Sequence, residues 1–321
     1  MAYSPVGSNN GTGNGSLPTA AGDRELFAKK FSTDVMKYFM DTNVAKALIT
    51  SKSIDSGKSE SFPVVGNATA VDIANDGGEL AIQNLKATER EIAIGDLTVA
   101  HAWITDLDKA MVHYDSQSAQ AESIGRALAK KVDIDIIAEV IEAGKIVDAT
   151  AATAYGLKDF SDDIYTAEVS TDVSTGALFY NACVLAVTEE AEKDTVGESQ
   201  FLVRPAQYYM LLNNPAQTGL TWVNDPFAQS GKVPMLLGKK VIQSPHFPAK
   251  TGPAGELQQG DVAAILFSKE AVGQLELMSV STRIDYIPQR LSNLVVGKMA
   301  VGYGVLNHGC AINIKSSVLV V

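Results

Sequence analysis

The stretch SQSAQAESIGRALAKKVDIDIIAEVIEA, residues 116–143, contains no proline and predicts one long amphipathic helix. Its main apolar residues recur at steps of four, which places them on one face of a helix: Ile124, Leu128, Val132, Ile136 and Val140. Asp115 stands at the N-cap position, and Gly144 follows the last helical residue. At 1.5 Å per residue the helix would be about 40 Å long, which is more than a typical globular helix spans. This length favours a subunit built to assemble, although an ordinary α+β enzyme could also hold such a helix.

The N-terminal region divides into a polar and an apolar part. Residues 1–22 are rich in glycine, asparagine and serine, so we expect them to be flexible unless a partner holds them. Asp23 is then expected to cap a short helix that carries three phenylalanines, Phe27, Phe31 and Phe39. These rings need cover. The sequence leaves open whether they pack on the chain's own core or on a neighbouring subunit.

A long β-hairpin is predicted before the central helix. Residues 61–71 form its first strand, Asn75 to Gly78 its turn, and residues 89–104 its second strand. The apolar alternation of the second strand changes phase at Gly95 and Asp96, which predicts a bulge or bend. Charged residues crowd the distal half of the hairpin: Asp72, Asp76, Glu79, Lys86, Glu89, Arg90 and Glu91. With so little apolar content, the hairpin is expected to project or to lie on a partner.

The remainder of the chain alternates between helices and strands, which is typical of an α+β fold. We expect a helix over residues 176–193 and a short helix that opens at Pro205. Strands are predicted at 201–203, within 233–243 and at 262–267, followed by a brief helical turn at 271–273. From residue 275 to the end the pattern is strand after strand. A length of 321 residues fits one large or two ordinary domains.

Composition excludes several classes of protein. The formal net charge is −11, and no cluster of lysine or arginine could follow a phosphate backbone, so direct nucleic-acid binding is disfavoured. The two cysteines lie far apart and imply no disulfide framework. The apolar runs are too short to span a bilayer, and no signal peptide is recognisable. We therefore expect folding in the cytoplasm and no contact with a membrane.

No motif predicts a catalytic, cofactor or metal site. The four histidines do not pair at metal-ligand spacing. His308-Gly309-Cys310 comes nearest to a nucleophile site, but Cys310 borders a strand and is expected to be a buried hydrophobe. Gly302-Tyr303-Gly304 lacks the lysine and the helix of a phosphate loop. The acidic pairs Asp106/Asp108 and Asp162/Asp163 are weak candidates for a cation site, the first because carboxylates also favour helix starts.

Several short motifs resemble the major capsid proteins of T7-like tailed bacteriophages. They lie mostly in the first part of the chain: Ser56-Gly57-Lys58-Ser59, Phe62-Pro63-Val64 with Gly66, Asp106-Leu107, Ala110-Met111 and His113-Tyr114-Asp115. Ala21-Gly22-Asp23, Leu26-Phe27, Pro245-His246 and Met299-Ala300 with Gly302 and Gly304 also fit. The resemblance extends over most of the chain from about residue 20 and suggests a phage of a cyanobacterium.

This resemblance implies the HK97-like capsid fold, with its parts in a defined order. An N-terminal arm would comprise residues 1–55 and an extended loop residues 56–104. A peripheral domain would comprise residues 105–145 and 267–321, with the helix 116–143 as its spine. An axial domain would comprise residues 146–266. The predicted subunit contacts are the hairpin charges given above together with Phe27, Phe31, Phe39 and Phe62.

The resemblance also implies a structural function. Copies of the chain would form the hexamers and pentamers of an icosahedral head with T=7 geometry, which encloses double-stranded DNA without reading its sequence. A scaffolding protein and a portal protein would be partners, with assembly in the host cytoplasm and the virion as the destination. A non-basic wall would avoid trapping phosphates. Two alternatives stay open, a cellular nanocompartment of the same fold and a soluble α+β enzyme.

Overall fold

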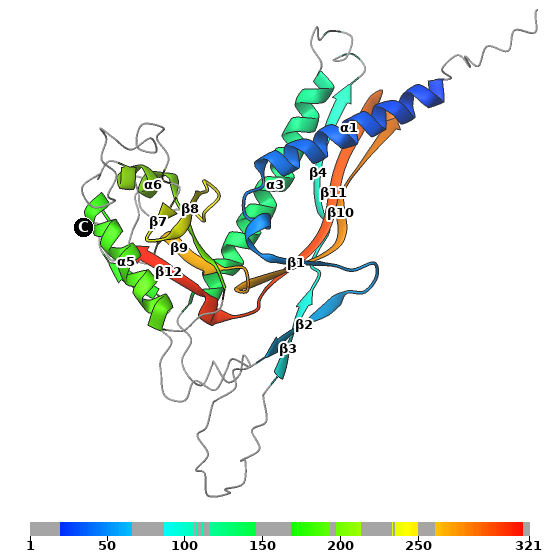
Figure 1. Cartoon of the computed structure of the whole chain (residues 1–321). Coiled ribbons are helices and arrows are strands. Elements are labelled where there is room, and N and C mark those ends of the chain that lie inside the picture. Colours follow the sequence, from blue (N-terminus) through cyan, green and yellow to red (C-terminus); the bar gives the residue numbers. More distant parts are fainter. Residues whose placement is uncertain are drawn as a thin grey trace, which may run out of the picture.

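A long central helix, α3, lies between the two main sheets of the molecule (Figure 1). The computed structural model describes residues 20–65, 87–105, 107, 111, 116–145, 168–171, 173–192, 197–212, 233, 235–249 and 261–316. Helix α3 spans Ser116–Ala143, as the sequence predicted. The predicted N-cap, Asp115, lies outside the described residues. Gly144 follows the helix without a left-handed φ, and its small size admits the side chain of Asn313, which a Cβ would meet at 2.7 Å.

A four-stranded sheet packs on one side of α3. Its strand order is β1-β10-β11-β4, with bounds β1 Thr50–Ser53, β10 Val272–Ile287, β11 Ser292–Val305 and β4 Thr98–Thr105. Strands β10, β11 and β4 are antiparallel, and β1 is parallel to β10. The predicted helical turn at 271–273 is wrong, because Val272 and Gly273 begin β10 and are held there by pairing with β11. Helix α1, Ala20–Thr42, crosses α3 and closes the main core.

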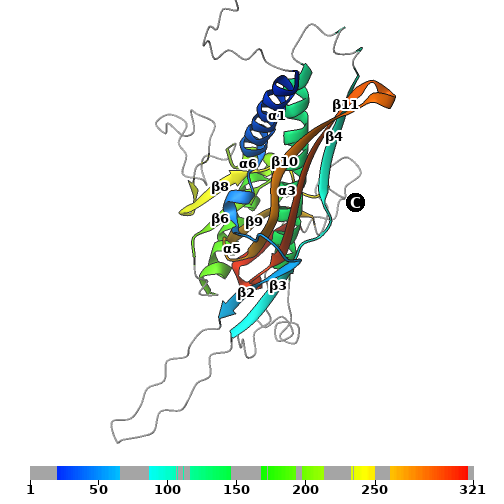
Figure 2. The same ribbon diagram turned by 90° about the vertical axis from the view of Figure 1, so that its right-hand side faces the viewer.

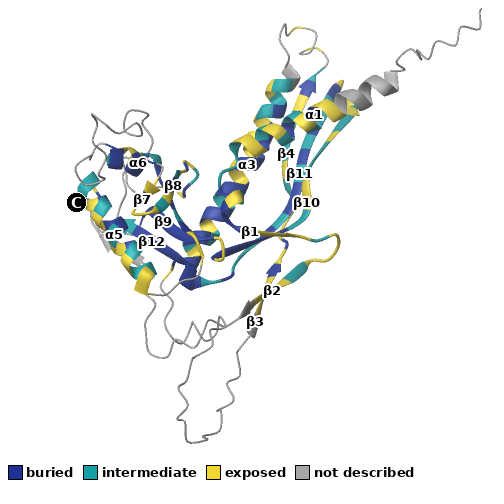
Figure 3. Cartoon of the chain, in the orientation of Figure 1, coloured by how far each residue is buried: buried dark blue, intermediate teal, exposed yellow. Residues whose placement is uncertain are grey.

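A six-stranded sheet forms the other half of the molecule. Its order is β5-β12-β9-β6-β8-β7, with bounds β5 Glu168–Thr171, β12 Ala311–Ser316, β9 Val262–Ser268, β6 Ser199–Val203, β8 Lys239–Gln243 and β7 Met235–Leu236. Helices α5, Gly176–Glu192, and α6, Pro205–Leu212, share a second core with it. Strands β9 and β12 are buried along nearly their whole length (Figure 3). The predicted peripheral domain, residues 267–321, thus includes a strand, β12, that pairs within this sheet.

Two turns differ from the expectation. The single strand predicted within residues 233–243 is a hairpin, because Leu237 and Gly238 both adopt positive φ, +52° and +79°. Leucine at such a position gives no turn signal, so only the glycine marked it. Helix α1 begins at Ala20, so Asp23 lies inside the helix and is not its N-cap. Three 3-10 helices, Lys46–Leu48, Pro288–Arg290 and His308–Cys310, complete the described elements.

A two-stranded ribbon projects from the four-stranded sheet (Figure 2). It consists of β2, Ser59–Val65, and β3, Ala87–Ala93, in antiparallel register. The sequence predicted one strand over 89–104 with a bulge or bend at Gly95 and Asp96. The structure instead breaks the chain there into β3 and β4, which pair in different sheets. The predicted change of direction is confirmed as a bend at Asp96, where the chain crosses from one sheet to the other, and not as a bulge.

Candidate functional site

The described residues contain no group of three or more His, Cys, Asp or Glu side chains placed to hold a metal ion. The acidic pairs Asp106/Asp108 and Asp162/Asp163 fall outside the described residues. Cys183 is buried, and burial raises the pKa of its thiol to about 12, so that thiol stays protonated. None of the described helices is long and apolar enough to cross a membrane. Among the described residues, the features that point to a function are the projecting ribbon, an exposed face of the four-stranded sheet and a buried polar junction.

The segment His308-Gly309-Cys310 caps the end of α3. His308 Nδ1 donates a hydrogen bond to the carbonyl oxygen of Ala143 at 3.1 Å, which satisfies one of the free carbonyls at the helix end. Cys310 is buried in the main core, as the sequence predicted for a small hydrophobe. Burial lowers the pKa of His308 and outweighs the opposing effect of the Ala143 carbonyl. The imidazole therefore has a structural role as a neutral cap.

Replacing His308 by glutamine is expected to make the subunit less sensitive to acid. The folded-state pKa of His308 lies below its ordinary value of about 6.5, so the unfolded chain binds the extra proton first as pH falls. The contribution of His308 to stability is present above pH 6.5 and is lost below it. Melting temperatures of wild type and His308→Gln measured between pH 7.5 and about pH 5 would test this. Parallel curves for the two proteins would contradict it.

Two of the three predicted contact residues of α1 are buried within the chain itself. Phe31 and Phe39 are 3% and 6% exposed and lie in the main core, so the chain's own core is the cover observed for these two rings. The side chain of Phe27 lies outside the described residues. Helix α1 approaches α3 closely at Gly125, where an added Cβ would stand 2.7 Å from the Val35 carbonyl oxygen.

The ribbon carries the predicted subunit-contact residues on both of its faces. Phe62 is buried with Ile92 in a small core against the four-stranded sheet. Glu89 and Glu91 are exposed and Arg90 is half-buried, and Glu91 accepts a hydrogen bond from the Ser59 hydroxyl. Asp72, Asp76, Glu79 and Lys86 lie outside the described residues.

Three glycines of the four-stranded sheet form the surface on which the ribbon packs, which we call its seat. Sequence reasoning missed them. An added Cβ at Gly302 would collide with the carbonyl oxygen of Ala93, and one at Gly273 or Gly304 would press on the side chain of Ile92. The Gly302-Tyr303-Gly304 motif therefore serves a close approach between two sheets. Glycine inside a strand pattern is the signal that could have shown this.

The outer face of the four-stranded sheet, which we define as the face turned away from α3, carries exposed apolar side chains along and just before β4, with the exposed His101 between them. Leu97, Val99 and Trp103 are 50%, 46% and 41% exposed, whereas Ile104 on the opposite face is buried. The guanidinium of Arg290 lies 4.9 Å from the centroid of the Trp103 ring. Leu291 beside it is 64% exposed with φ +44°, an unusual conformation for leucine. This apolar surface has no cover within the described part of the chain.

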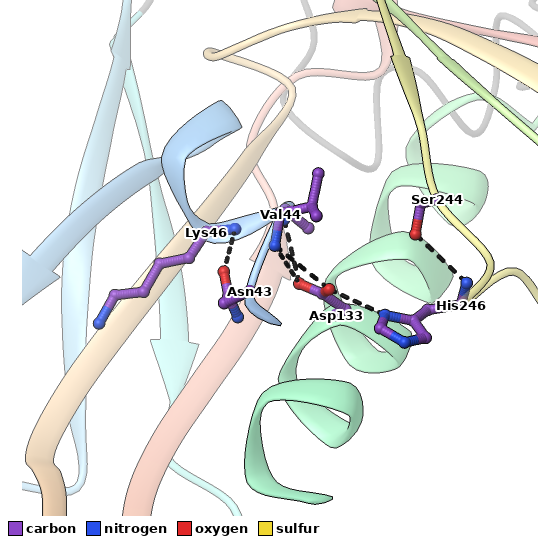
Figure 4. Close-up of polar contacts among 7 residues, drawn as sticks. Asn43, Val44, Lys46, Asp133, Ser244 and His246 are labelled. Atoms are coloured by element: carbon purple, nitrogen blue, oxygen red, sulfur yellow. Dashed lines mark hydrogen bonds and ion pairs between the residues drawn. The ribbon is translucent and has the colours of Figure 1, made fainter. Parts of the chain in front are cut away.

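A polar junction joins α3 to the segment after α1 and to the loop after β8 (Figure 4). The carboxylate of Asp133 on α3 accepts hydrogen bonds from the backbone of Val44 and Ala45, and it contacts His246 Nδ1 at 2.9 Å. Sequence reasoning missed Asp133 as a buried residue. The signal was its place four residues after Ala129 and four before Ile137, which puts it on the buried side of α3.

Comparisons with known proteins all point to major capsid proteins of phages. A family model described as Gp10A-like, major capsid protein, matches residues 61–315. The chain is 25% identical over 340 residues to the major capsid protein of Escherichia phage T7, covering 97% of this chain and 98% of that protein. The corresponding protein of Enterobacteria phage T3 is 24% identical, with 97% of each covered.

Solved structures show the same fold. The capsid structure of the cyanophage P-SCSP1u has a TM-score of 0.66 at 24% identity, over 85% of this chain and 88% of that chain. A virus-like particle from Pyrococcus furiosus has a TM-score of 0.57 at 12% identity, over 90% and 99% of the two chains.

These likenesses confirm the predicted α+β fold of the HK97-like kind and the predicted resemblance to T7-like capsid proteins. The family model covers most of the chain, so it also decides between the alternatives, against an enzyme and against a cellular nanocompartment. The chain belongs to the Gp10A-like family of major capsid proteins and is a structural subunit of the virion capsid of a phage.

Proposed function

We propose that this chain is the repeating subunit of an icosahedral head with T=7 geometry, built from hexamers and pentamers around double-stranded DNA. A scaffolding protein and a portal protein are its assembly partners. The observation that carries the proposal is the apolar outer face along β4, which nothing described in the chain covers. Exposed apolar patches of this kind on a soluble subunit are typical of protein interfaces.

Within that subunit, residues 1–55 are the N-terminal arm and 56–104 the extended loop. Residues 105–145 and 267–321 form the peripheral domain with α3 as its spine, and 146–266 form the axial domain. The division is supported by the second core, which lies between α5, α6 and the six-stranded sheet. The main core joins α1, α3 and the four-stranded sheet, and it also takes in Leu202, Val262 and Ile265 of the axial stretch. Strand β12 belongs to the peripheral stretch in sequence and returns to the axial sheet by pairing with β9.

The extended loop makes the second set of contacts. We infer that Asp72, Asp76, Glu79 and Lys86, together with Glu89, Arg90 and Glu91 of the ribbon, form polar contacts with a neighbouring subunit. Exposed ion pairs contribute about 0–1 kcal/mol each. In a closed shell every subunit is held by several neighbours at once, so small terms add up to a stable particle.

The charge of the chain suits a container for DNA. With a formal net charge of −11, the subunit as a whole repels phosphates and does not attract them to the wall. Packaged DNA would then stay free to move during filling and release.

Co-expression with the cognate scaffolding protein tests the proposal. Closed particles tens of nanometres across should be seen by negative-stain electron microscopy, and image reconstruction would give their triangulation number. Monomers or small oligomers over a range of salt concentrations would overturn the proposal. Closed particles with another triangulation number would overturn the T=7 geometry alone.

Replacing Trp103 by alanine is expected to lower the yield of shells several-fold while the subunit stays folded. The ring is partly exposed and lies outside both main cores, so the melting temperature of the subunit should change little. Large aromatic side chains commonly dominate the binding energy of interfaces. Trp103→Phe keeps an aromatic ring beside Arg290 and should retain most of the yield. Equal yields for wild type and Trp103→Ala would exclude this face as a contact surface.

A further inference from the structure

Asp133 is a fully buried carboxylate that receives its donors from two distant parts of the chain. Oδ1 accepts from the backbone N–H of Ala45 at 3.0 Å and of Val44 at 3.3 Å. Oδ2 accepts from His246 Nδ1 at 2.9 Å and again from Val44 at 3.3 Å. A carboxylate can only accept, so Nδ1 carries the proton of that bond. A buried carboxylate is costly unless it is paired and hydrogen-bonded, so both sets of donors matter.

The first set belongs to a rigid turn at the end of α1. The side chain of Asn43 accepts a hydrogen bond from the backbone N–H of Lys46 at 2.9 Å, which fixes the shape of residues 43–46. The ammonium of Lys46 lies 2.8 Å from the Glu276 carboxylate on β10. Asp133 therefore determines where the chain leaves α1, against both α3 and the four-stranded sheet.

The second donor belongs to a loop that is tied to the six-stranded sheet. Ser244 N–H donates to the carbonyl of Val203 at 3.1 Å. The guanidinium of Arg204 donates to the carbonyl oxygens of Pro248 at 2.9 Å and Val262 at 2.6 Å. The same guanidinium lies 5.0 Å from the ring centroid of Phe247. These contacts fix the loop of His246 to the six-stranded sheet.

We propose that Asp133 couples the docking of α1 to the position of the six-stranded sheet. With the turn at 43–46 docked, the carboxylate is sealed from water, and its attraction to the His246 donor acts in a low dielectric. Without His246, the same sealing leaves the carboxylate with fewer donors and less compensation for its lost hydration. Each contact therefore strengthens the other. A rotation of the six-stranded sheet that withdraws His246 would loosen α1, and release of α1 would free the sheet.

This coupling is a property of the single subunit and goes beyond the proposed shell function. It predicts an effect at residues that the mutated side chain does not touch. His246→Ala should speed amide hydrogen exchange in residues 43–46 by about tenfold, the size of a typical coupling between two sites. In an Asp133→Asn background, where no buried charge needs compensation, the same replacement should change that exchange less than about twofold.

Three variants serve as controls. His246→Gln keeps a donor and should restore most of the protection of residues 43–46. His101→Ala makes the same change at an exposed histidine of β4 and should leave these residues unaffected. Asp135→Asn makes the neutral replacement on the same helix, at a carboxylate that pairs with Lys131 at the surface, 2.6 Å away. It should also leave the turn protected.

The measurement is hydrogen–deuterium exchange by mass spectrometry on the full-length chain as unassembled subunits, with β9 as an internal reference. Because no shell is needed, the result can be read even if the proposed head does not form. Faster exchange in residues 43–46 with β9 unchanged, present only with Asp133 intact, supports the coupling. Unchanged exchange in His246→Ala overturns it. Equal acceleration with and without the Asp133 carboxylate also overturns it, because the effect is then general loosening.

Discussion

Deleting residues 66–86 is expected to leave a folded subunit that no longer forms stable shells. Val65 and Ala87 are cross-strand partners at the ends of β2 and β3, so a two-residue Asn-Gly turn can join them without changing the register. The residues that seat the ribbon, Phe62 and Ile92, lie outside the deleted segment. The melting temperature of the subunit should therefore shift by no more than a few degrees, as for changes at a surface.

Assembly should fail because the deletion removes the inferred contacts with the neighbouring subunit. A second variant separates the charge of the loop from its length. It keeps the full length of the loop and replaces Asp72, Asp76 and Glu79 by their amides and Lys86 by methionine. Its shells should form in lower yield, and their stability should depend less on salt than that of wild-type shells. Intact shells of unchanged salt tolerance after the deletion would mean that the hairpin packs on its own subunit.

The elements that follow one period over many residues were predicted most accurately. Helix α3 matches its prediction at both ends because its apolar stripe repeats from Ile124 to Val140 and no proline interrupts the 28 residues, which leaves few alternatives. Helix α5 was predicted to within one residue, and strand β9 likewise. In these segments local preference and burial agree, so the sequence alone determines the type of element.

Prediction failed where the neighbour of a segment decides its structure. The alternation over residues 89–104 changes phase at Gly95 and Asp96, but only the placement of two sheets shows that the chain there forms two strands, β3 and β4. Strand β12 follows β11 in sequence but pairs with β9 and β5. Pairing between strands is non-local, and periodicity within a strand carries no information about its partner.

The burial of Asp133 in the polar junction could not be predicted from the sequence either. Asp133 and Asp135 stand two positions apart in the run VDID, and both look like solvent-facing charges. Asp133 is fully buried among three hydrogen-bond donors, whereas Asp135 pairs with Lys131 at the surface. The helical phase places Asp133 near the stripe, but only the packing of residues 43–46 and 244–248 shows that donors meet it there.

Replacing Gly302 by alanine is expected to destabilise the subunit and to prevent normal shell assembly. In the middle of a strand, alanine ordinarily stabilises relative to glycine by about 0.5–1 kcal/mol, because the unfolded chain loses freedom. Here the new Cβ would collide with the carbonyl oxygen of Ala93 and stand 3.0 Å from the carbonyl carbon. Both are backbone atoms, so no rotation of a side chain can relieve the contact. The end of β3 must move away from β11.

That movement would lift Ile92 and Phe62 from their seat on the four-stranded sheet and redirect the whole extended loop. Overpacking of this kind costs about 1–3 kcal/mol, so the sign of the stability change is the reverse of the ordinary one. Gly95→Ala is the matched control, because Gly95 lies just beyond β3 and no atom stands within 4 Å of the place that the new methyl group would take. Thermal unfolding and particle yield should separate the two variants clearly, with Gly95→Ala close to wild type. If both behave alike, the ribbon is not held by close contact at Gly302, and its direction must be determined by contacts elsewhere.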